Sequence, residues 1–131
     1  KIKGRTAFAE VEKVISASPF RTDPECSYFG RCGGCDLQQL DISSQLAAKK
    51  AIFRDCIERI GKIHYEDDIR IISSPEPFGY RLRAQWHVDT IGRKIGYYRR
   101  DSRDLVEIED CPVLAPELRQ RLSQYRSEMP W

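Results

Sequence analysis

The chain has 131 residues, of which 40% are hydrophobic and 32% are charged, and its formal net charge is +2. These proportions are typical of a folded globular domain and exclude an intrinsically disordered chain. No apolar run approaches the roughly 20 residues of a membrane helix, and no signal-peptide pattern opens the chain, so we expect a cytoplasmic protein without a membrane partner. Because it starts at Lys1 and its only methionine is Met129, we expect a piece of a longer protein.

The first half of the chain predicts a strand, a loop rich in cysteine and a helix. Residues 6–16 (TAFAEVEKVIS) are typical of a strand that ends near Ser16, and two prolines indicate an extended connector after it. Asp41 or Ser43 can cap a helix that runs to Gly61. The helix should bury one apolar face, formed by Leu46, Phe53, Cys56, Ile57 and Ile60. A short strand should follow it over residues 69–73.

The second half predicts three antiparallel strands and a helix. Apolar and polar residues alternate strictly over residues 80–89, which indicates a half-buried strand. Hairpin connections lead into strands over residues 95–100 and 105–109. A final helix over residues 115–129 would bury Leu118, Leu122, Tyr125 and Met129, with Pro116 in its first turn. The predicted fold class is α+β: an antiparallel β-sheet covered on one face by helices, with a cysteine-rich loop.

Three of the five cysteines fall within ten residues, in the stretch PECSYFGRCGGCDLQQL. Cys26, Cys32 and Cys35 precede the first helix, and a metal site usually needs a fourth ligand. Cys56 falls on the predicted buried face of that helix, where cysteine commonly acts as a small hydrophobic residue. Cys111 follows the last predicted strand in a loop, so it is the better fourth ligand.

Four uses of these thiols compete. Disulfides are disfavoured by the odd number of cysteines and the expected cytoplasmic location. A thioredoxin-like Cys-x-x-Cys would leave Cys26 and Cys111 unexplained. A structural zinc site is chemically reasonable, although its commoner pattern is two separated close pairs. An iron–sulfur cubane suits three clustered cysteines plus a distant one, and neighbouring glycines bring backbone amides toward the sulfurs. The spacing leaves zinc, a cluster and unligated thiols open.

Basic residues concentrate between residues 80 and 103, where seven Lys and Arg accompany two Asp. Such a stripe is the usual footprint of a phosphate-backbone partner, but a solvated hairpin explains the charge equally well. Strand alternation places Arg81 and Arg83 on one side, and a regular strand would place Arg99 and Arg100 on opposite sides.

The aromatic residues of this region are also divided by strand alternation, between the core and the polar face. Tyr80 and Tyr97 are in phase with apolar neighbours, so we expect them in the core. Tyr98 is the better candidate for stacking on a base. His87 lies on the polar face, where it is as well explained as ordinary surface as by a contact with nucleic acid.

Three stretches together resemble a known family: PECSYFGRCGGCDLQQL, PFGYRLRAQ and IGYYRRDSRDLVEIEDCPVLAPEL. In this order and spacing they resemble the RNA uracil-C5 methyltransferases, in the branch that carries a 4Fe–4S cluster and modifies 23S ribosomal RNA or tRNA. The resemblance covers nearly the whole chain from about Ser18. It implies that the cluster ligands are Cys26, Cys32, Cys35 and Cys111, and that Cys56 is a buried bystander.

The resemblance also implies that the face carrying YRLRAQ lies along the RNA. The expected RNA-binding residues are Arg81, Arg83, Gln85, Tyr98, Arg99 and Arg100. In some relatives an arginine that contacts RNA occupies the position of Gln85. The glutamine keeps hydrogen-bonding capacity but lacks the positive charge.

The resemblance further implies a division into domains. Residues 1–17 look like the trailing strand of an N-terminal TRAM-like β-barrel that is mostly absent, and residues 18–131 look like the central cluster-binding domain. The family's catalytic cysteine, base and S-adenosylmethionine site belong to a C-terminal doubly wound domain. This sequence has no Gly-x-Gly and no cysteine after Cys111. We therefore expect the parent protein, a monomer, to be the enzyme, and this chain to be inactive by itself.

A hypothesis from a different class stays open beside this one. In it, the chain is a zinc- or cluster-stapled interaction module, in which the metal stabilises the fold and the partner is a protein. The identity of the metal and the salt dependence of RNA binding separate the two hypotheses.

Overall fold

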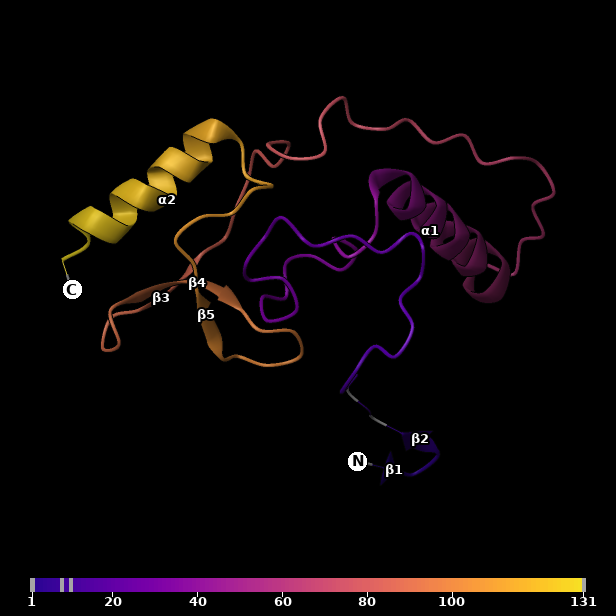
Figure 1. Ribbon diagram of the computed structural model, residues 1–131, viewed down its shortest axis with the longest axis horizontal. Coiled ribbons are helices and arrows are strands. Elements are labelled where there is room, and N and C mark those ends of the chain that lie inside the picture. Colours follow the sequence, from indigo (N-terminus) through magenta and orange to yellow (C-terminus); the bar gives the residue numbers. More distant parts are fainter. Residues whose placement is uncertain (1, 8, 10, 131) are drawn as a thin grey trace.

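The structure is a computed structural model that describes residues 2–7, 9 and 11–130. Its elements in chain order are β1 (Ile2–Lys3), β2 (Thr6–Ala7), α1 (Ile42–Asp55), the π-helical turn η1 (Cys56–Ile60), β3 (His87–Asp89), β4 (Lys94–Tyr98), β5 (Leu105–Glu107) and α2 (Pro116–Glu128). Figure 1 shows α2 lying over the sheet of β3, β4 and β5, while α1 stands apart. The chain that carries the first three cysteines (purple) runs between these two parts.

The three-stranded antiparallel sheet confirms the predicted α+β fold class. Its strand order is β3-β4-β5, so neighbours in the sequence are neighbours in the sheet. Strand β3 pairs with residues 94–96 of β4, and β5 pairs with residues 96–98. Both connections are hairpins, as predicted.

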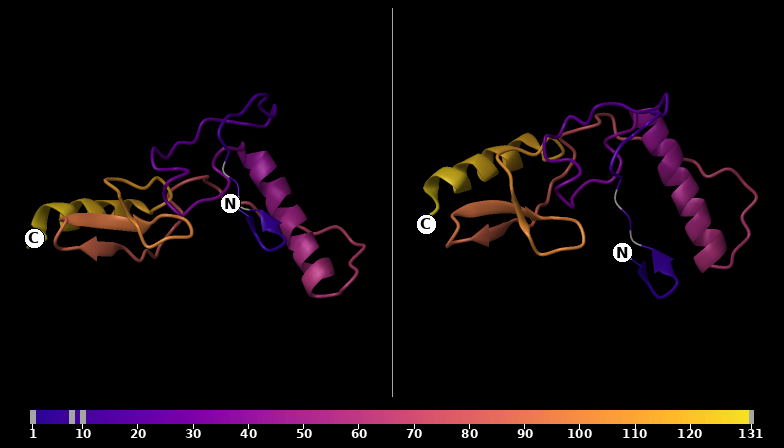
Figure 2. Two further views of the ribbon diagram at one scale, coloured as in Figure 1. Left: turned by 90° about the horizontal axis from the view of Figure 1, so that it is seen from below. Right: turned by 60° about the horizontal axis from the view of Figure 1, so that its bottom comes forward.

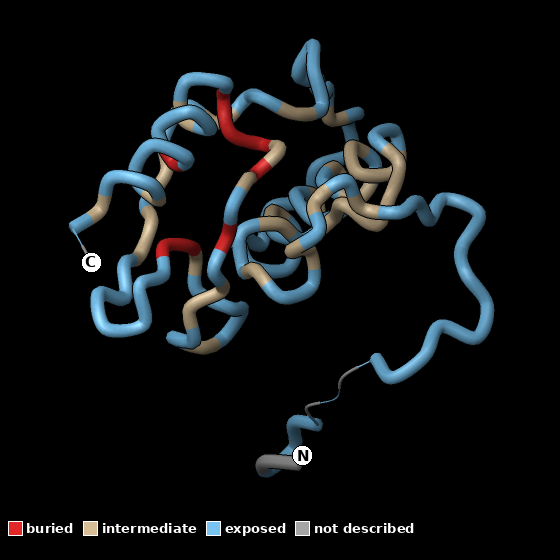
Figure 3. Tube along the Cα trace, turned by 60° about the vertical axis from the view of Figure 1, so that its left-hand side comes forward, coloured by how far each residue is buried: buried red, intermediate tan, exposed pale blue. Residues whose placement is uncertain are grey.

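The hydrophobic core lies between this sheet, α2 and the segment that joins them. Figure 3 shows the buried residues (red) gathered in this part of the molecule. The buried hydrophobic residues among them are Ile95, Ile108, Cys111, Val113, Leu114, Ala115 and Leu122, and Gly96 of β4 is buried as well. The predicted apolar face of α2 is confirmed at Leu122, which is 0% exposed, and at Leu118, which packs against the same cluster. The predicted burial of Tyr125 is wrong: it meets the ring of Trp86 edge-on, with centroids 6.0 Å apart, but is 45% exposed.

Strand β3 is shorter than the strand predicted over residues 80–89, and the cysteine loop is the reason. In an antiparallel strand the backbone groups of alternate residues point to opposite edges. Because the C=O of Ile95 accepts from the N–H of Ile108 on the β5 side, the C=O of Tyr98, an odd number of residues away, points to the β3 side. That C=O accepts a hydrogen bond from the N–H of Gly33 at 3.0 Å. The cysteine loop therefore occupies the position that an extended β3 would need.

The chain before β3 bonds to a different segment. The N–H of Arg81 donates to the C=O of Val113 (2.8 Å), and its C=O accepts from the N–H of Ala115 (3.0 Å). Because this segment pairs with residues 113–115 and not with β4, its first apolar side chains are not buried as the alternation predicts. Tyr80 is 52% exposed and Leu82 is 76% exposed. The prediction that Tyr80 fills the core is wrong.

Helix α1 begins and ends as its sequence predicts. The Oδ1 atom of Asp41 accepts a hydrogen bond from the N–H of Ser44 at 2.8 Å. The hydroxyl of Ser43 and then this N–H hold the pKa of Asp41 below its ordinary value. The helix closes through η1 to Gly61, where a Cβ would lie 2.6 Å from the C=O of Ile57.

The predicted burial of one face of α1 is wrong. Phe53 is 54% exposed, Ile60 is 67% exposed and Cys56 is exposed, while Leu46 and Ile57 are half-buried. Both views in Figure 2 show the cause, because α1 projects away from the sheet and from α2. Cys56 is therefore a surface thiol and not a buried bystander.

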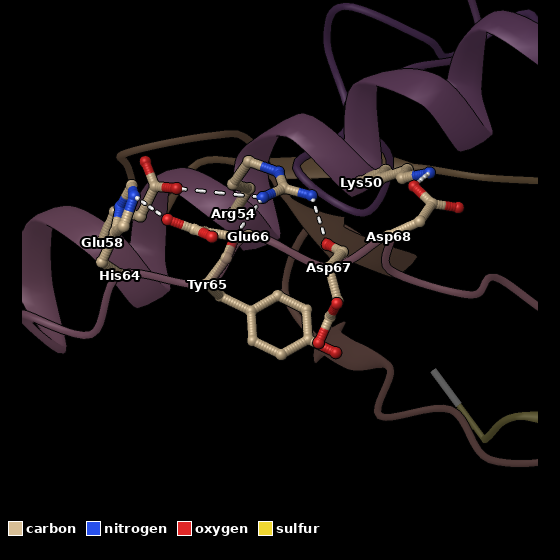
Figure 4. Close-up of polar contacts among 8 residues, drawn as sticks. All are labelled: Lys50, Arg54, Glu58, His64, Tyr65, Glu66, Asp67 and Asp68. Atoms are coloured by element: carbon tan, nitrogen blue, oxygen red, sulfur yellow. Dashed lines mark hydrogen bonds and ion pairs between the residues drawn. The ribbon is translucent and has the colours of Figure 1, made fainter.

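The loop that follows η1 is tied back to α1 by charged side chains, as Figure 4 shows. Arg54 donates from Nη1 to the C=O of Tyr65 (2.5 Å) and from Nη2 to the C=O of Asp67 (3.0 Å). One turn earlier, Lys50 pairs with the carboxylate of Asp68. This pairing is the main reason that the pKa of Asp68 is below its ordinary value.

Within the part of the chain that the structure describes, one predicted strand is much shorter than expected and another is absent. β1 and β2 form a short antiparallel hairpin, and β2 ends at Ala7, so the strand predicted to reach Ser16 is wrong. Residues 9 and 11–16 have no strand partner, and Phe8 and Glu10 lie outside the described residues. Residues 69–73 also form no strand. Within the described ranges, no helix combines the length and apolar content that crossing a bilayer requires.

Candidate metal centre

The cysteine loop is a series of tight turns closed by its own backbone. The C=O of Tyr28 accepts hydrogen bonds from the N–H groups of Arg31 (3.1 Å) and Cys32 (2.9 Å). The C=O of Cys26 accepts from the N–H of Phe29 at 3.0 Å. These bonds fold the five residues between the first two cysteines into a compact turn, so Cys26 and Cys32 are held close in space.

Glycine is required where this loop meets the sheet. A Cβ on Gly33 would lie 3.1 Å from both the C=O oxygen of Tyr98 and the backbone nitrogen of Arg100. Both obstacles are backbone atoms, which cannot turn aside. A Cβ on Gly34 would meet only the sulfur of Cys32 at 3.4 Å and an arginine nitrogen farther away, which are ordinary contacts. Gly33 thus permits the close approach of the loop to β4.

The fourth cysteine comes from the segment that joins β5 to α2. Cys111 is 8% exposed, and its C=O accepts a hydrogen bond from the N–H of Leu114 (3.0 Å). The cysteine loop reaches this segment directly, because the hydroxyl oxygen of Tyr28 accepts from the N–H of Glu109 at 3.1 Å. Cys35 packs against the core cluster that contains Cys111. Three cysteines close in sequence are thus brought to a distant fourth.

The thiols are close enough to influence one another electrostatically. Burial is the main cause that raises the pKa of Cys111, and the thiols of Cys26 and Cys35 raise it further. Burial also raises the pKa of Cys26, with added contributions from Cys35 and Cys32. Thiols that are buried or half-buried and disfavour one another's charge are relieved by binding a cation.

The four thiols do not converge as tightly as a single ion needs. All five cysteines are free, and among the described residues no three His, Cys, Asp or Glu side chains form a group that could hold one metal ion. Four thiolates around zinc must all come within about 2.3 Å of one atom.

A buried amide beside the loop also fits a sulfur-rich ligand. Gln38 accepts a hydrogen bond at Oε1 from the N–H of Cys26 (3.2 Å). Its Nε2 is buried and has no hydrogen-bond partner within the described part of the molecule. An unsatisfied buried donor is costly, and a bound sulfide or thiolate would accept from it. Residue spacing alone did not single out this glutamine.

The six predicted RNA-binding residues fall into two groups. Arg83, Gln85, Tyr98 and Arg99 are exposed at the surface around β3 and β4. Arg81 and Arg100 direct their guanidinium groups to the backbone of the cysteine loop, where Arg81 donates to the C=O of Gly34 at 3.3 Å.

Tyr98 also has an aromatic neighbour that the sequence pattern did not predict. The rings of His87 and Tyr98 stack, with centroids 3.8 Å apart and an angle of 18° between their planes. Tyr98 is 38% exposed, so the pair forms a flat aromatic surface at the edge of the sheet. Tyr97 is half-buried, as expected, and its hydroxyl accepts a hydrogen bond from Trp86 Nε1 at 3.1 Å.

Comparison with known proteins gives a consistent set of relatives, although no protein-family model matches the chain. An uncharacterized RNA methyltransferase of Prochlorococcus marinus is 34% identical over 128 residues, which are 95% of this chain and 30% of that protein. One from Aquifex aeolicus is 41% identical over 112 residues, or 83% and 25%. A 23S rRNA (uracil(1939)-C(5))-methyltransferase of Pseudomonas entomophila is 37% identical over 120 residues, or 88% and 26%. The chain spans 25% to 30% of the length of these relatives.

Proposed function

The chain belongs to the RNA methyltransferase family that includes 23S rRNA uracil-C5 enzymes, and on that premise we propose that it carries the iron–sulfur cluster of such an enzyme and contributes to RNA recognition. In this proposal Cys26, Cys32, Cys35 and Cys111 are the ligands. The methyl donor of the whole enzyme is S-adenosylmethionine, and its substrate is a uridine of 23S rRNA or tRNA in the cytoplasm.

One observation carries the proposal: a loop with three cysteines is held against a fourth that is distant in sequence. The N–H of Glu109, which donates to the Tyr28 hydroxyl, joins these two parts, and the backbone bond from Gly33 to Tyr98 holds the loop against β4. A bound cluster would supply a rigid cross-link between the loop and the β5–α2 segment. The unpaired Nε2 of Gln38 beside Cys26 supports a sulfur-rich occupant.

The proposed RNA surface consists of the exposed members of the basic stripe and the aromatic pair. Arg83 and Arg99 offer positive charge to phosphates, and Gln85 offers a neutral donor and acceptor. The stacked rings of His87 and Tyr98 offer a flat face to an unpaired base. This combination suits single-stranded or looped RNA, in which bases are free to stack.

The proposal divides the work of the parent enzyme between domains. Residues 18–131 form the central domain, which positions RNA, and residues 1–17 continue from a TRAM-like barrel. Transfer of the methyl group takes place on a separate catalytic domain, toward which the target uridine is flipped. The 131-residue chain alone is expected to bind RNA and to be inactive as a methyltransferase, and the parent enzyme to act as a monomer.

The cluster is tested by purifying the chain without oxygen and measuring absorption, iron, sulfide and zinc. We expect a broad band near ~400 nm with about four irons and four sulfides per chain. Cys111→Ser should lose the band, while the exposed Cys56→Ser should keep it and serves as the matched control. Circular dichroism checks that both variants fold. One zinc per chain, with no iron taken up on reconstitution, would contradict the cluster and favour the zinc-stapled module.

A further inference from the structure

Two arginines of the basic stripe contact the turn that carries Cys35. Arg81 donates from Nη2 to the C=O of Gly34 at 3.3 Å. Arg100 donates from Nη2 to the C=O of Cys35 at 3.4 Å and pairs with the carboxylate of Asp36. The two carbonyls are consecutive in the chain, so this single turn receives a guanidinium group from each side.

The two arginines are themselves anchored in different parts of the fold. The backbone of Arg81 is bonded to Val113 and Ala115, just beyond Cys111. Arg100 follows β4, where the preceding residue, Arg99, forms a backbone bridge with Cys32. Arg81 therefore links the turn to the Cys111 segment, and Arg100 links it to the sheet.

We propose that Arg81 and Arg100 are positioning residues that latch the turn at Gly34–Asp36 onto the Cys111 segment and onto β4, and thereby place the four thiols around one centre. A guanidinium suits this task, because it donates several hydrogen bonds in a fixed plane and stays charged. The role as part of a metal centre rests on the proposed function. The latch is a property of the chain itself and is measurable without metal.

The first test uses the metal-free chain and compares Arg81→Gln, Arg100→Gln and Arg83→Gln. Each variant removes one positive charge, but only the first two remove a contact with the turn. We expect the Gly33 amide, which bonds to Tyr98, to exchange its hydrogen about threefold to tenfold faster in the first two variants. Arg83→Gln should leave this exchange unchanged.

Thiol alkylation gives an independent readout in the same samples. Cys32 and Cys35 should react faster in Arg81→Gln and Arg100→Gln, while the exposed Cys56 provides an internal reference. Asp36→Asn should reproduce part of the effect of Arg100→Gln and add little to it in the double variant, because both changes break the same ion pair, while Arg100→Gln also removes the hydrogen bond to Cys35. A Gly33 amide that is unprotected in the unsubstituted chain, or equally protected in all variants, overturns the latch.

The second test adds iron and sulfide to the chain and to the same variants, and also measures their binding to RNA. If no iron binds while the Gly33 exchange still responds, the proposed cluster fails and the latch stands. If Arg81→Gln and Arg100→Gln weaken RNA binding and leave the Gly33 exchange unchanged, both residues are RNA contacts and the latch is overturned.

Discussion

Replacing Gly33 by alanine tests the docking of the cysteine loop on β4 most directly. The new Cβ would lie 3.1 Å from the Tyr98 oxygen and 3.1 Å from the Arg100 nitrogen, closer than most real Cβ contacts. Because both atoms belong to the backbone, of β4 and of the turn that follows it, the loop itself must move. Gly34→Ala is the matched control, since its nearest contact, at 3.4 Å to the Cys32 sulfur, is ordinary.

The expected cost follows from the contacts that must be given up. Moving the loop loses the Gly33–Tyr98 hydrogen bond, which contributes about 1 kcal/mol. Overpacking against fixed atoms adds about 1–3 kcal/mol. The lower entropy of the unfolded alanine chain returns about 0.4–1 kcal/mol in both variants. Gly33→Ala should therefore destabilise the docked loop by about 2 kcal/mol, which is roughly a 30-fold increase in its opening. Gly34→Ala should be neutral or slightly stabilising.

Hydrogen exchange of the loop amides measures this opening, with Cys32 as a second reporter because its N–H is bonded to Tyr28 within the loop. In Gly33→Ala we expect fast exchange at residue 33 and slower exchange at Cys32, because the loop leaves the sheet while its internal turn survives. Urea unfolding followed by circular dichroism reports the rest of the fold. If Gly33→Ala and Gly34→Ala give the same protection at residue 33, the loop does not dock on β4 as described.

Three further predictions concern the core, the helix cap and the RNA surface. Leu122→Ala should lower the free energy of unfolding, measured in urea, by about 2–5 kcal/mol. Leu82→Ala, at a residue that is 76% exposed, should change it by less than about 0.5 kcal/mol. Equal losses in the two variants would show that the core is elsewhere. The pKa of Asp41 is lowered in the folded chain, so its contribution to stability should be fully present above the ordinary carboxyl pKa and be lost as the pH falls through the folded value. Asp41→Asn should flatten this part of the pH–stability curve, and an unchanged curve would argue against the cap. Arg83→Gln should reduce the slope of log RNA affinity against log salt concentration by about 1. Arg70→Gln, in the exposed loop after η1, should leave this slope unchanged. An equal slope in both variants would remove Arg83 from the RNA surface.

Local signals in the sequence were sufficient for the elements that depend on neighbours in the chain. Asp41 predicts the start of α1, Gly61 predicts its end, and Pro116 predicts the first turn of α2, because capping and turn preferences act within a few residues. The three antiparallel strands were predicted for the same reason, since short hairpins place consecutive strands side by side.

Predictions that depended on a distant partner were less successful. Alternation over residues 80–89 predicts a strand, but a strand also needs an edge to pair with, and the cysteine loop takes that edge at Tyr98. The apolar spacing of α1 predicts a buried face, but α1 stands apart from the sheet, so Phe53 and Cys56 are exposed. Periodicity shows which side chains could be buried together, and it does not show what would cover them.

For the candidate site, the sequence by itself determined which thiols are available and which two stretches carry them. The count, the spacing of Cys26, Cys32 and Cys35, and the loop position of Cys111 were all readable from the chain. Only the tertiary structure decided that Arg81 and Arg100 donate hydrogen bonds to the cysteine loop, although Arg100 is exposed at the surface, as Arg83 and Arg99 are. The physical reason is that the type and spacing of residues can be taken directly from the sequence. The direction of a long side chain, by contrast, depends on which backbone carbonyls the fold brings within its reach.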